Sequence, residues 1–178
     1  MSHTTKHAEV RELVARIRRE TGRRVPDVDP NGPGIQAAVL LLFRAPNERG
    51  SLETGLMAFD NPDPTARYER ELMDEVGLSQ DICVGWNAIP WDIGNEPIAQ
   101  KHRRRGASYL KDLLRLFDRA PVVVAHGGEA HAVCRIAGVE AIEVPMTSPR
   151  GLYGGGANRR SAAADGLRRA AKLSTPEP

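Results

Sequence analysis

The sequence contains little cysteine, and the two cysteines that it has are far apart. Among 178 residues, Cys83 and Cys134 are the only thiols, and neither belongs to a Cys-x-x-Cys pair. Two thiols cannot supply the four-thiolate set of a structural zinc or iron–sulfur centre, and isolated cysteines most often serve as small core residues. We therefore expect no metal site built on cysteine.

Long hydrophobic runs are also missing. The longest strongly apolar run, residues 37–43, is far shorter than the ~20 residues that a membrane-crossing helix needs. The first twelve residues, MSHTTKHAEVRE, contain no apolar core of a secretory signal. These absences predict a cytoplasmic protein that works without a membrane.

Neither sign of charge dominates. The 25 basic and 23 acidic residues give a net charge of +2, so the overall charge does not indicate a nucleic-acid-binding protein. The basic residues are nevertheless clustered, in residues 16–24, 101–105 and 150–169. Each cluster is either a solvated helix face or part of a positive surface that a nucleic acid could bind.

Three common catalytic signatures are absent. The chain has no Gly-x-Ser-x-Gly, no Gly-x-x-x-x-Gly-Lys-[Ser/Thr] and no complete Gly-x-Gly-x-x-Gly, which argues against the common hydrolase, nucleoside-triphosphate and dinucleotide functions. The segment HGGEAH, residues 126–131, lacks the histidine spacing of a helical zinc site, so we interpret it as a turn into a helix. No metal and no cofactor are expected.

Short apolar runs alternate with helical patterns along the chain. Helices are predicted over residues 5–20, from Pro64 to the stop at Gly77, around residues 110–117, and over 129–136 and 161–173. Strands are predicted at residues 37–43, 83–87, 122–126 and 141–145. Because a helix follows each strand except the last, the pattern predicts an α/β fold, a three-layer α/β/α sandwich with a four-stranded parallel sheet. Residues 1–178 would form one domain, with an N-terminal helix within 1–22 and a frayed tail at 174–178.

Ligands of open parallel sheets bind at the carboxyl ends of the strands, so the residues just after each apolar run are the candidates. Asn87 ends a strand directly before Ala-Ile-Pro-Trp91, which predicts a carboxamide in an apolar, tryptophan-walled pocket. An amide offers both a donor and an acceptor, as the edge of a pyrimidine requires; alternatively, Asn87 closes a turn. Phe59 lies in a loop crossing the same edge, where it either stacks on a flat ligand or belongs to the core.

A late segment, Ser-Pro-Arg-Gly at residues 148–151, combines backbone amides with a guanidinium and would suit a phosphate, although it would equally suit a plain turn.

Four segments in this order resemble the uracil-DNA glycosylase superfamily. They are the loop RAPN after the first strand, GLMAFDNPDPTA, GWNAIPW and SPRGL, and the likeness runs from about Ala37 to the C-terminal helix. The resemblance implies a four-stranded parallel sheet between helices. It also implies hydrolysis of the N-glycosidic bond of uracil or a related damaged base that is flipped out of DNA, as in base excision repair. The expected partners are DNA and uracil or another nucleobase, and we expect a monomer.

The resemblance also assigns roles. Phe59 resembles the residue that stacks on the base, Asn87 resembles the residue that reads it, and Pro46 belongs to the base-binding first loop. The late loop, Met146 to Leu152, resembles the wedge that enters the duplex. The DNA-binding residues in it would be Ser148, Pro149, Arg150 and Gly151.

Two positions depart from the family pattern. Arg44 stands where an acidic or water-holding residue is expected, and Met146 stands where the family has a histidine that stabilises the departing base. Asn47 and Glu48 are then the candidates for holding the attacking water. Losing a donor of this kind can cost ~3 to 4 kcal/mol of transition-state stabilisation, so weak or altered glycosylase activity is expected.

Two further interpretations stay open. The chain could be a catalytically inactive DNA-binding or nucleobase-binding member of the same fold. It could also be a small-molecule-binding α/β protein whose likeness to the family is architectural only.

Overall fold

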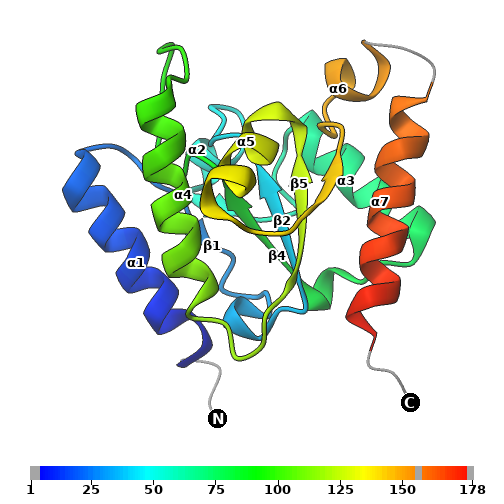
Figure 1. Ribbon diagram of the computed structural model, residues 1–178, viewed down its shortest axis with the longest axis horizontal. Helices are drawn as coiled ribbons and strands as arrows, with labels where there is room; N and C mark the ends of the chain where they lie inside the picture. The colour runs from blue at the N-terminus through cyan, green and yellow to red at the C-terminus, as the bar shows by residue number, and fades with distance from the viewer. Residues whose placement is uncertain (1–4, 155–157, 176–178) are drawn as a thin grey trace.

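The central sheet is built from four short runs of apolar residues. In the computed structural model, which describes residues 5–154 and 158–175, these runs form β2 (Val39–Phe43), β4 (Cys83–Asn87), β5 (Val122–His126) and β6 (Ile142–Val144). They pair in parallel in the order β4-β2-β5-β6 (Figure 1). Val39 is paired with both Cys83 and Val122, so β2 lies inside the sheet. The predicted four-stranded parallel sheet is confirmed.

Helices cover both faces of this sheet. Leu40 and Leu42 of β2 face one hydrophobic core, which they share with α1 (Thr5–Thr21), α4 (Gln100–Leu114) and α5 (Gly127–Ala137). Val39 and Leu41 point the opposite way, as the period of a strand requires, into a second core with α3 (Pro64–Val76) and α7 (Arg159–Ser174). Figure 1 shows α1 and α4 on one side of the sheet and α3 and α7 on the other. The three-layer α/β/α prediction is confirmed.

Several short elements escaped the sequence pattern. The strands β1 (Asp27–Val28) and β3 (Leu56–Met57) pair in parallel as a separate two-stranded sheet. Three short helical turns are η1 (Gly34–Gln36), η2 (Gln80–Ile82) and α2 (Ser51–Thr54). Elements of two to four residues have too few positions to display a period, so their formation depends on tertiary contacts.

The late segment Met146 to Leu152, expected as a loop, is helical from Pro149 onward, so that part of the expectation is wrong. Residues Pro149–Tyr153 form α6, whose first position is a proline, and the hydroxyl of Ser148 accepts a hydrogen bond from the Gly151 N–H at 3.1 Å. Nearer the C-terminus, α7 continues through Ser174, so the first residue of the predicted frayed tail is helical, and residues 176–178 lie outside the described part.

Helix α3 begins and ends as its sequence predicts. Asp63 caps its first turn by accepting hydrogen bonds from the backbone N–H groups of Thr65 and Ala66, and Pro64 occupies the first helical position. Gly77, with φ +72°, ends the helix in the left-handed conformation that glycine adopts without strain. The cap fixes where α3 starts, and the start of α3 borders the pocket described below.

The strand order creates a crevice at one end of the sheet. From β2 the chain passes through α3 to β4, and from β4 it passes through α4, on the opposite face, to β5 on the other side of β2. The chain leaves the carboxyl end of β2 through α3 toward β4, and it leaves the carboxyl end of β5 through α5, on the opposite face, toward β6. The two connections diverge between β2 and β5, which is where open α/β sheets bind ligands. In the described part of the chain, no helix combines the length and apolar character needed to cross a bilayer.

Candidate functional site

A pocket of about 210 Å³ lies at the carboxyl ends of the strands. Its lining comes from the ends of β2 and β4, from the loops around α2 and β3, from the first turns of α3, and from the segment that precedes α6. The lining is mixed: Phe43, Met57 and Phe59 supply apolar surface, while Asn87 and Glu69 are polar and buried. A concave, largely apolar site with a few polar groups is the usual form of a small-molecule pocket.

The pocket brings together four of the residues that the sequence singled out. Asn47, Phe59, Asn87 and Ser148 all line it, although they come from four different segments. Asn87 is buried, Phe59 and Ser148 are half-buried, and Asn47 is exposed. The pocket therefore has Asn87 in its interior and Asn47 at its mouth.

Local contacts hold the base-binding candidates in place. The side-chain amide of Asn87 donates to the sulfur of Met57 at 3.0 Å, across from β4 to β3. The carbonyl of Phe59 accepts a hydrogen bond from the guanidinium of Arg70 on α3. Asn61 closes the same loop, because its amide donates to the Leu56 carbonyl at 2.9 Å. The Phe59 loop is thus tied both to α3 and to its own start.

The tryptophan expected to wall the pocket lies elsewhere. Trp91 is 5% exposed and belongs to the core formed with α1 and α4. There its ring makes an edge contact with the ring of Tyr109, with 6.1 Å between the centroids. Trp91 is not among the lining residues, and neither is Ile89. The chain turns to the α1 and α4 face directly after Asn87, so the flat apolar surface comes instead from Phe43, Phe59 and Met57. That part of the prediction is wrong.

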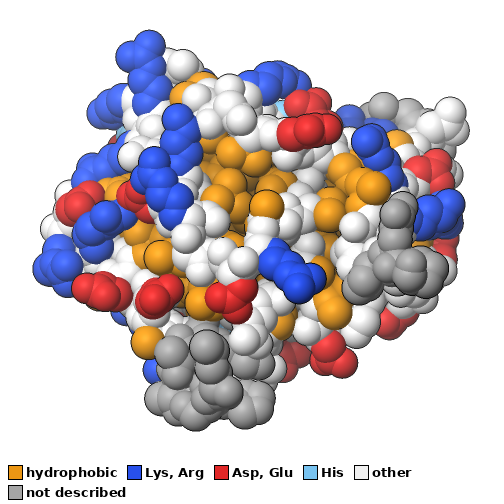
Figure 2. Space-filling view, turned by 60° about the horizontal axis from the view of Figure 1, so that its bottom comes forward, with side chains coloured by type: hydrophobic (Ala, Val, Ile, Leu, Met, Phe, Trp, Pro, Cys, Tyr) orange, Lys and Arg blue, Asp and Glu red, His pale blue; other side chains and the backbone are white. Residues whose placement is uncertain are grey.

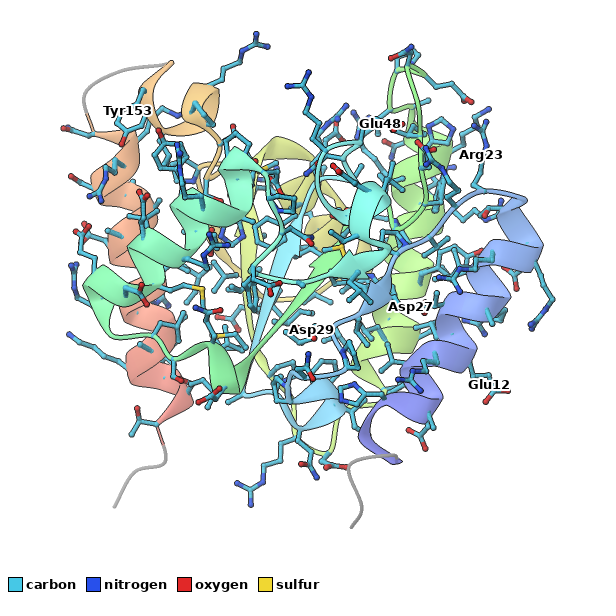
Figure 3. All side chains as sticks on the ribbon, turned by 180° about the vertical axis from the view of Figure 1, so that it is seen from behind. Glu12, Arg23, Asp27, Asp29, Glu48 and Tyr153 are labelled. Atoms are coloured by element: carbon cyan, nitrogen blue, oxygen red, sulfur yellow. The ribbon has the colours of Figure 1, made fainter. Side chains whose placement is uncertain are left out.

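Glu48 and Pro46 also lie outside the pocket. The Glu48 side chain is 71% exposed and forms an ion pair with Arg24 at 3.0 Å. Figure 3 shows Glu48 on the side of the molecule that carries Arg23, far from Tyr153. Pro46 is buried but does not line the pocket. Of the two residues proposed to hold water, only Asn47 borders the pocket.

The two positions that depart from the family pattern both line the pocket. Arg44 is exposed, and within residues 5–154 and 158–175 it forms no ion pair. Met146 is held close to the sheet because Gly127, with φ +79°, and Gly151 leave room for it. A Cβ atom at Gly151 would overlap the Met146 carbonyl oxygen. Gly151 is thus explained by close packing of the backbone, while Pro149 and Arg150 lie on α6 outside the pocket.

A buried acid–histidine pair was missed by the sequence analysis. Glu69 of α3 and His126 at the end of β5 are both 0% exposed, and Glu69 Oε1 lies 3.1 Å from His126 Nε2. The other ring nitrogen, Nδ1, lies 3.3 Å from the Leu42 carbonyl oxygen. The Phe43 ring stacks on the imidazole, with 4.6 Å between the ring centroids. Glu69 lines the pocket, and its Oε2 has no hydrogen-bond partner among the described residues.

One signal could have revealed Glu69. It lies three and four residues before Leu72 and Met73, which are buried on the inner face of α3, so it occupies a core position of that helix. A glutamate at a core position is rare unless it is paired. His126 carried a weaker signal, because it ends an apolar strand at the edge where ligands bind.

Most members of the first basic cluster are neutralised. Arg24 forms an ion pair with Asp92 at 2.8 Å, Arg18 with Asp27 at 2.9 Å, and Arg16 with Asp112. Figure 2 shows acidic side chains interspersed with basic ones on the face that it displays. This cluster therefore agrees with the interpretation as a solvated, ion-paired surface.

The two cysteine thiols are expected to be unreactive at neutral pH. Burial raises the pKa of Cys83 and of Cys134 to about 12, so both are protonated at neutral pH. Among the described residues, no group of three or more His, Cys, Asp or Glu side chains is placed to hold a metal ion.

Comparison with protein-family models and with curated proteins finds no match.

Proposed function

We propose that this protein binds a flipped nucleobase of DNA in the pocket at the carboxyl edge of its sheet. In this proposal it is a divergent uracil-DNA glycosylase-like hydrolase with weak or altered activity toward uracil or a related damaged base. The observation that supports it most is that Phe59, Asn87 and Ser148, which come from three of the family-like motifs, line one pocket.

The size and lining of the pocket suit a pyrimidine ring. Its volume of about 210 Å³ exceeds the ~150 Å³ of an engineered apolar cavity that holds benzene. Enzymes that act on a flipped base contact its faces with aromatic or apolar side chains and its edge with hydrogen bonds. Here Phe43, Met57 and Phe59 offer the apolar surface and Asn87 the hydrogen-bonding edge.

The proposed reaction needs a water near the sugar and a stabilised base. Water attacks the anomeric carbon, and the electron pair of the N-glycosidic bond leaves with the base. The proton that the attacking water loses neutralises the base anion, directly or through solvent. Asn47, exposed at the mouth, can hydrogen-bond that water. Met146 offers no donor to the departing base, and the charge of Arg44 opposes positive charge on the sugar. Slow chemistry follows from these two side chains.

The second candidate function is a DNA-binding or nucleobase-binding protein without catalysis. It is favoured by Met146, which lines the pocket where the family-like motif has its donor. In that case Arg44 and Arg150, both exposed near the pocket end of the sheet, would contact phosphates.

Cleavage of a labelled, uracil-containing oligonucleotide under single-turnover conditions, with alkali to break abasic sites, tests the proposal. Wild type should cleave slowly. Met146→His should raise the rate by supplying a donor. Asn87→Asp buries a carboxyl group and should lower the melting temperature, but in a variant that stays folded at the assay temperature it should abolish cleavage or change the preferred base. If Met146→His binds DNA but never cleaves it, the non-catalytic function is the correct one.

DNA binding is tested separately by titration at several salt concentrations. Binding should weaken as salt increases, because neutralised phosphates release counterions. Arg150→Ala should weaken binding to every sequence equally, whereas Arg169→Ala, an exposed position on the far half of α7, serves as the matched control. No binding at ~50 mM salt, where phosphate contacts are strong, would rule out both DNA-directed functions.

A further inference from the structure

The buried pair formed by Glu69 and His126 shares one proton between its facing atoms. The Leu42 carbonyl can only accept a hydrogen bond, so His126 Nδ1 carries a proton. The 3.1 Å contact between His126 Nε2 and Glu69 Oε1 needs one further proton, on either atom, since two lone pairs or two protons would repel. Full burial disfavours a net charge on the pair, so Oε2 carries no additional proton and the pair is neutral as a unit.

This proton count fixes the chemical character of the remaining oxygen. If the proton is on His126, Glu69 is a carboxylate and Oε2 is an acceptor. If the proton is on Oε1, then Oε2 is the carbonyl oxygen of the acid and is again an acceptor. Oε2 is buried, has no partner among the described residues and belongs to a side chain in the pocket wall. A donor that entered through the pocket and reached Oε2 would satisfy it.

Glu69 Oε2 lies deeper in the molecule than the proposed position of the N-glycosidic bond at the pocket mouth. Glu69 is 0% exposed, whereas Asn47 is exposed. A base that enters from DNA keeps its sugar at the mouth, so Glu69 faces the edge of the base opposite to the sugar. It is too deep to hold the water that attacks the sugar.

We infer that Glu69 is a specificity-determining residue whose Oε2 accepts a hydrogen bond from a ring N–H at the deep edge of the bound heterocycle. The class of ligand is a flat cyclic imide or amide with a free N–H, as opposed to its N-alkylated analogue. His126 is the positioning residue, because it holds Oε1 and so turns Oε2 toward the ligand. The inference rests on the proposed function in taking the occupant to be a nucleobase.

Three free bases test the inference without DNA. Affinities for uracil, 1-methyluracil and 3-methyluracil are measured by ligand-observed nuclear magnetic resonance. The 1-methyl group takes the place of the sugar and should be tolerated. The 3-methyl group removes the deep N–H and should weaken binding by about 10-fold or more, as expected when a buried acceptor loses its hydrogen bond and stays unpaired. Equal binding of the two methylated bases would overturn the inference.

Variants assign that preference to Glu69 and not to Asn87. Glu69→Gln can donate its amide to His126 Nε2 and keep a carbonyl oxygen in the pocket, so the preference for 1-methyluracil should survive. Glu69→Met has no acceptor, and the preference should fall by about 10-fold. If Glu69→Met fails to fold, the double variant Glu69→Met, His126→Leu removes the unpaired histidine as well. Glu71→Gln, on the exposed side of the same helix, is the matched control.

The outcomes separate this inference from the proposed function. A Glu69-dependent preference for free N–H, together with no binding or cleavage of uracil-containing DNA, supports the inference and refutes the proposed function. Cleavage of such DNA with an unchanged preference in Glu69→Met refutes the inference and leaves the function standing. Failure of all three bases to bind at millimolar concentration overturns the inference, since Oε2 would then have only water as a donor.

Discussion

Replacing His126 with leucine should destabilise the fold strongly, because it leaves a buried carboxyl group without its partner. In the native protein both side chains are fully buried and share a hydrogen bond between His126 Nε2 and Glu69 Oε1, while Oε2 has no partner among the described residues. Removing one member of a buried pair typically costs about 3–5 kcal/mol. Each kcal/mol lowers the melting temperature of a domain of this size by about 2–4 °C, so a fall of about 6–20 °C is expected.

The double variant Glu69→Leu, His126→Leu separates the loss of the pair from the loss of packing. It removes the orphaned carboxyl group and leaves two apolar side chains of similar size, so it should recover much of the stability lost by His126→Leu alone. Urea unfolding of wild type, both single variants and the double variant gives a double-mutant cycle. A loss for His126→Leu of only the ~0.5 kcal/mol typical of surface changes, or additive losses across the cycle, would refute this reasoning.

Three further predictions concern the fold and its thiols. Asp63→Ala removes the cap of α3 and should cost about 0.5–2 kcal/mol in urea unfolding; an unchanged midpoint would contradict the capping role. Cys83 and Cys134, with pKa values raised to about 12, should react with a thiol reagent at pH 8 only after denaturation. The free energy of unfolding should fall above ~pH 8.5, because the thiols of the unfolded chain ionise there while those of the folded protein stay protonated. Gly106→Ala places a Cβ against the Ala88 carbonyl oxygen. This overlap should lower the free energy of unfolding by about 1–3 kcal/mol, which outweighs the ~1 kcal/mol that alanine gains over glycine in a helix. A more stable variant would show that α4 can shift freely.

The sheet could be predicted from the sequence because its strands are buried on both faces. Such strands appear as short apolar runs between turn residues, and the runs at residues 83–87 and 122–126 have the same bounds in the structure. The pair β1 and β3 could not be predicted, because two-residue strands have no period and depend on contacts with distant residues. The segment at residues 149–153 was expected as a loop because Ser-Pro-Arg-Gly, residues 148–151, also suits a turn.

The site was predictable only where a single position carried the signal. Asn87 and Phe59 could be placed at the carboxyl edge because strand ends and Pro-rich loops are visible in the sequence. Glu69 and His126 are 57 residues apart, and neither residue alone indicates the other, so their pairing needed the fold. Trp91 was misplaced because sequence order does not tell which face of the sheet the chain turns to after Asn87.

The parallel pairing of distant strands limits how much of the fold can form while the chain is still being synthesised. No two neighbouring strands of the sheet are joined by a hairpin; Val39 is paired with Cys83 and with Val122, so loops of tens of residues must close before any pairing stabilises the chain. A nascent chain that ends after β5 already contains Phe59 and Asn87, but it lacks Met146 and Ser148. It also lacks α7, which together with α3 buries the Val39 face of the sheet. Until α7 has left the ribosome, part of this apolar sheet face is exposed and suited to chaperone binding, and the pocket is incomplete.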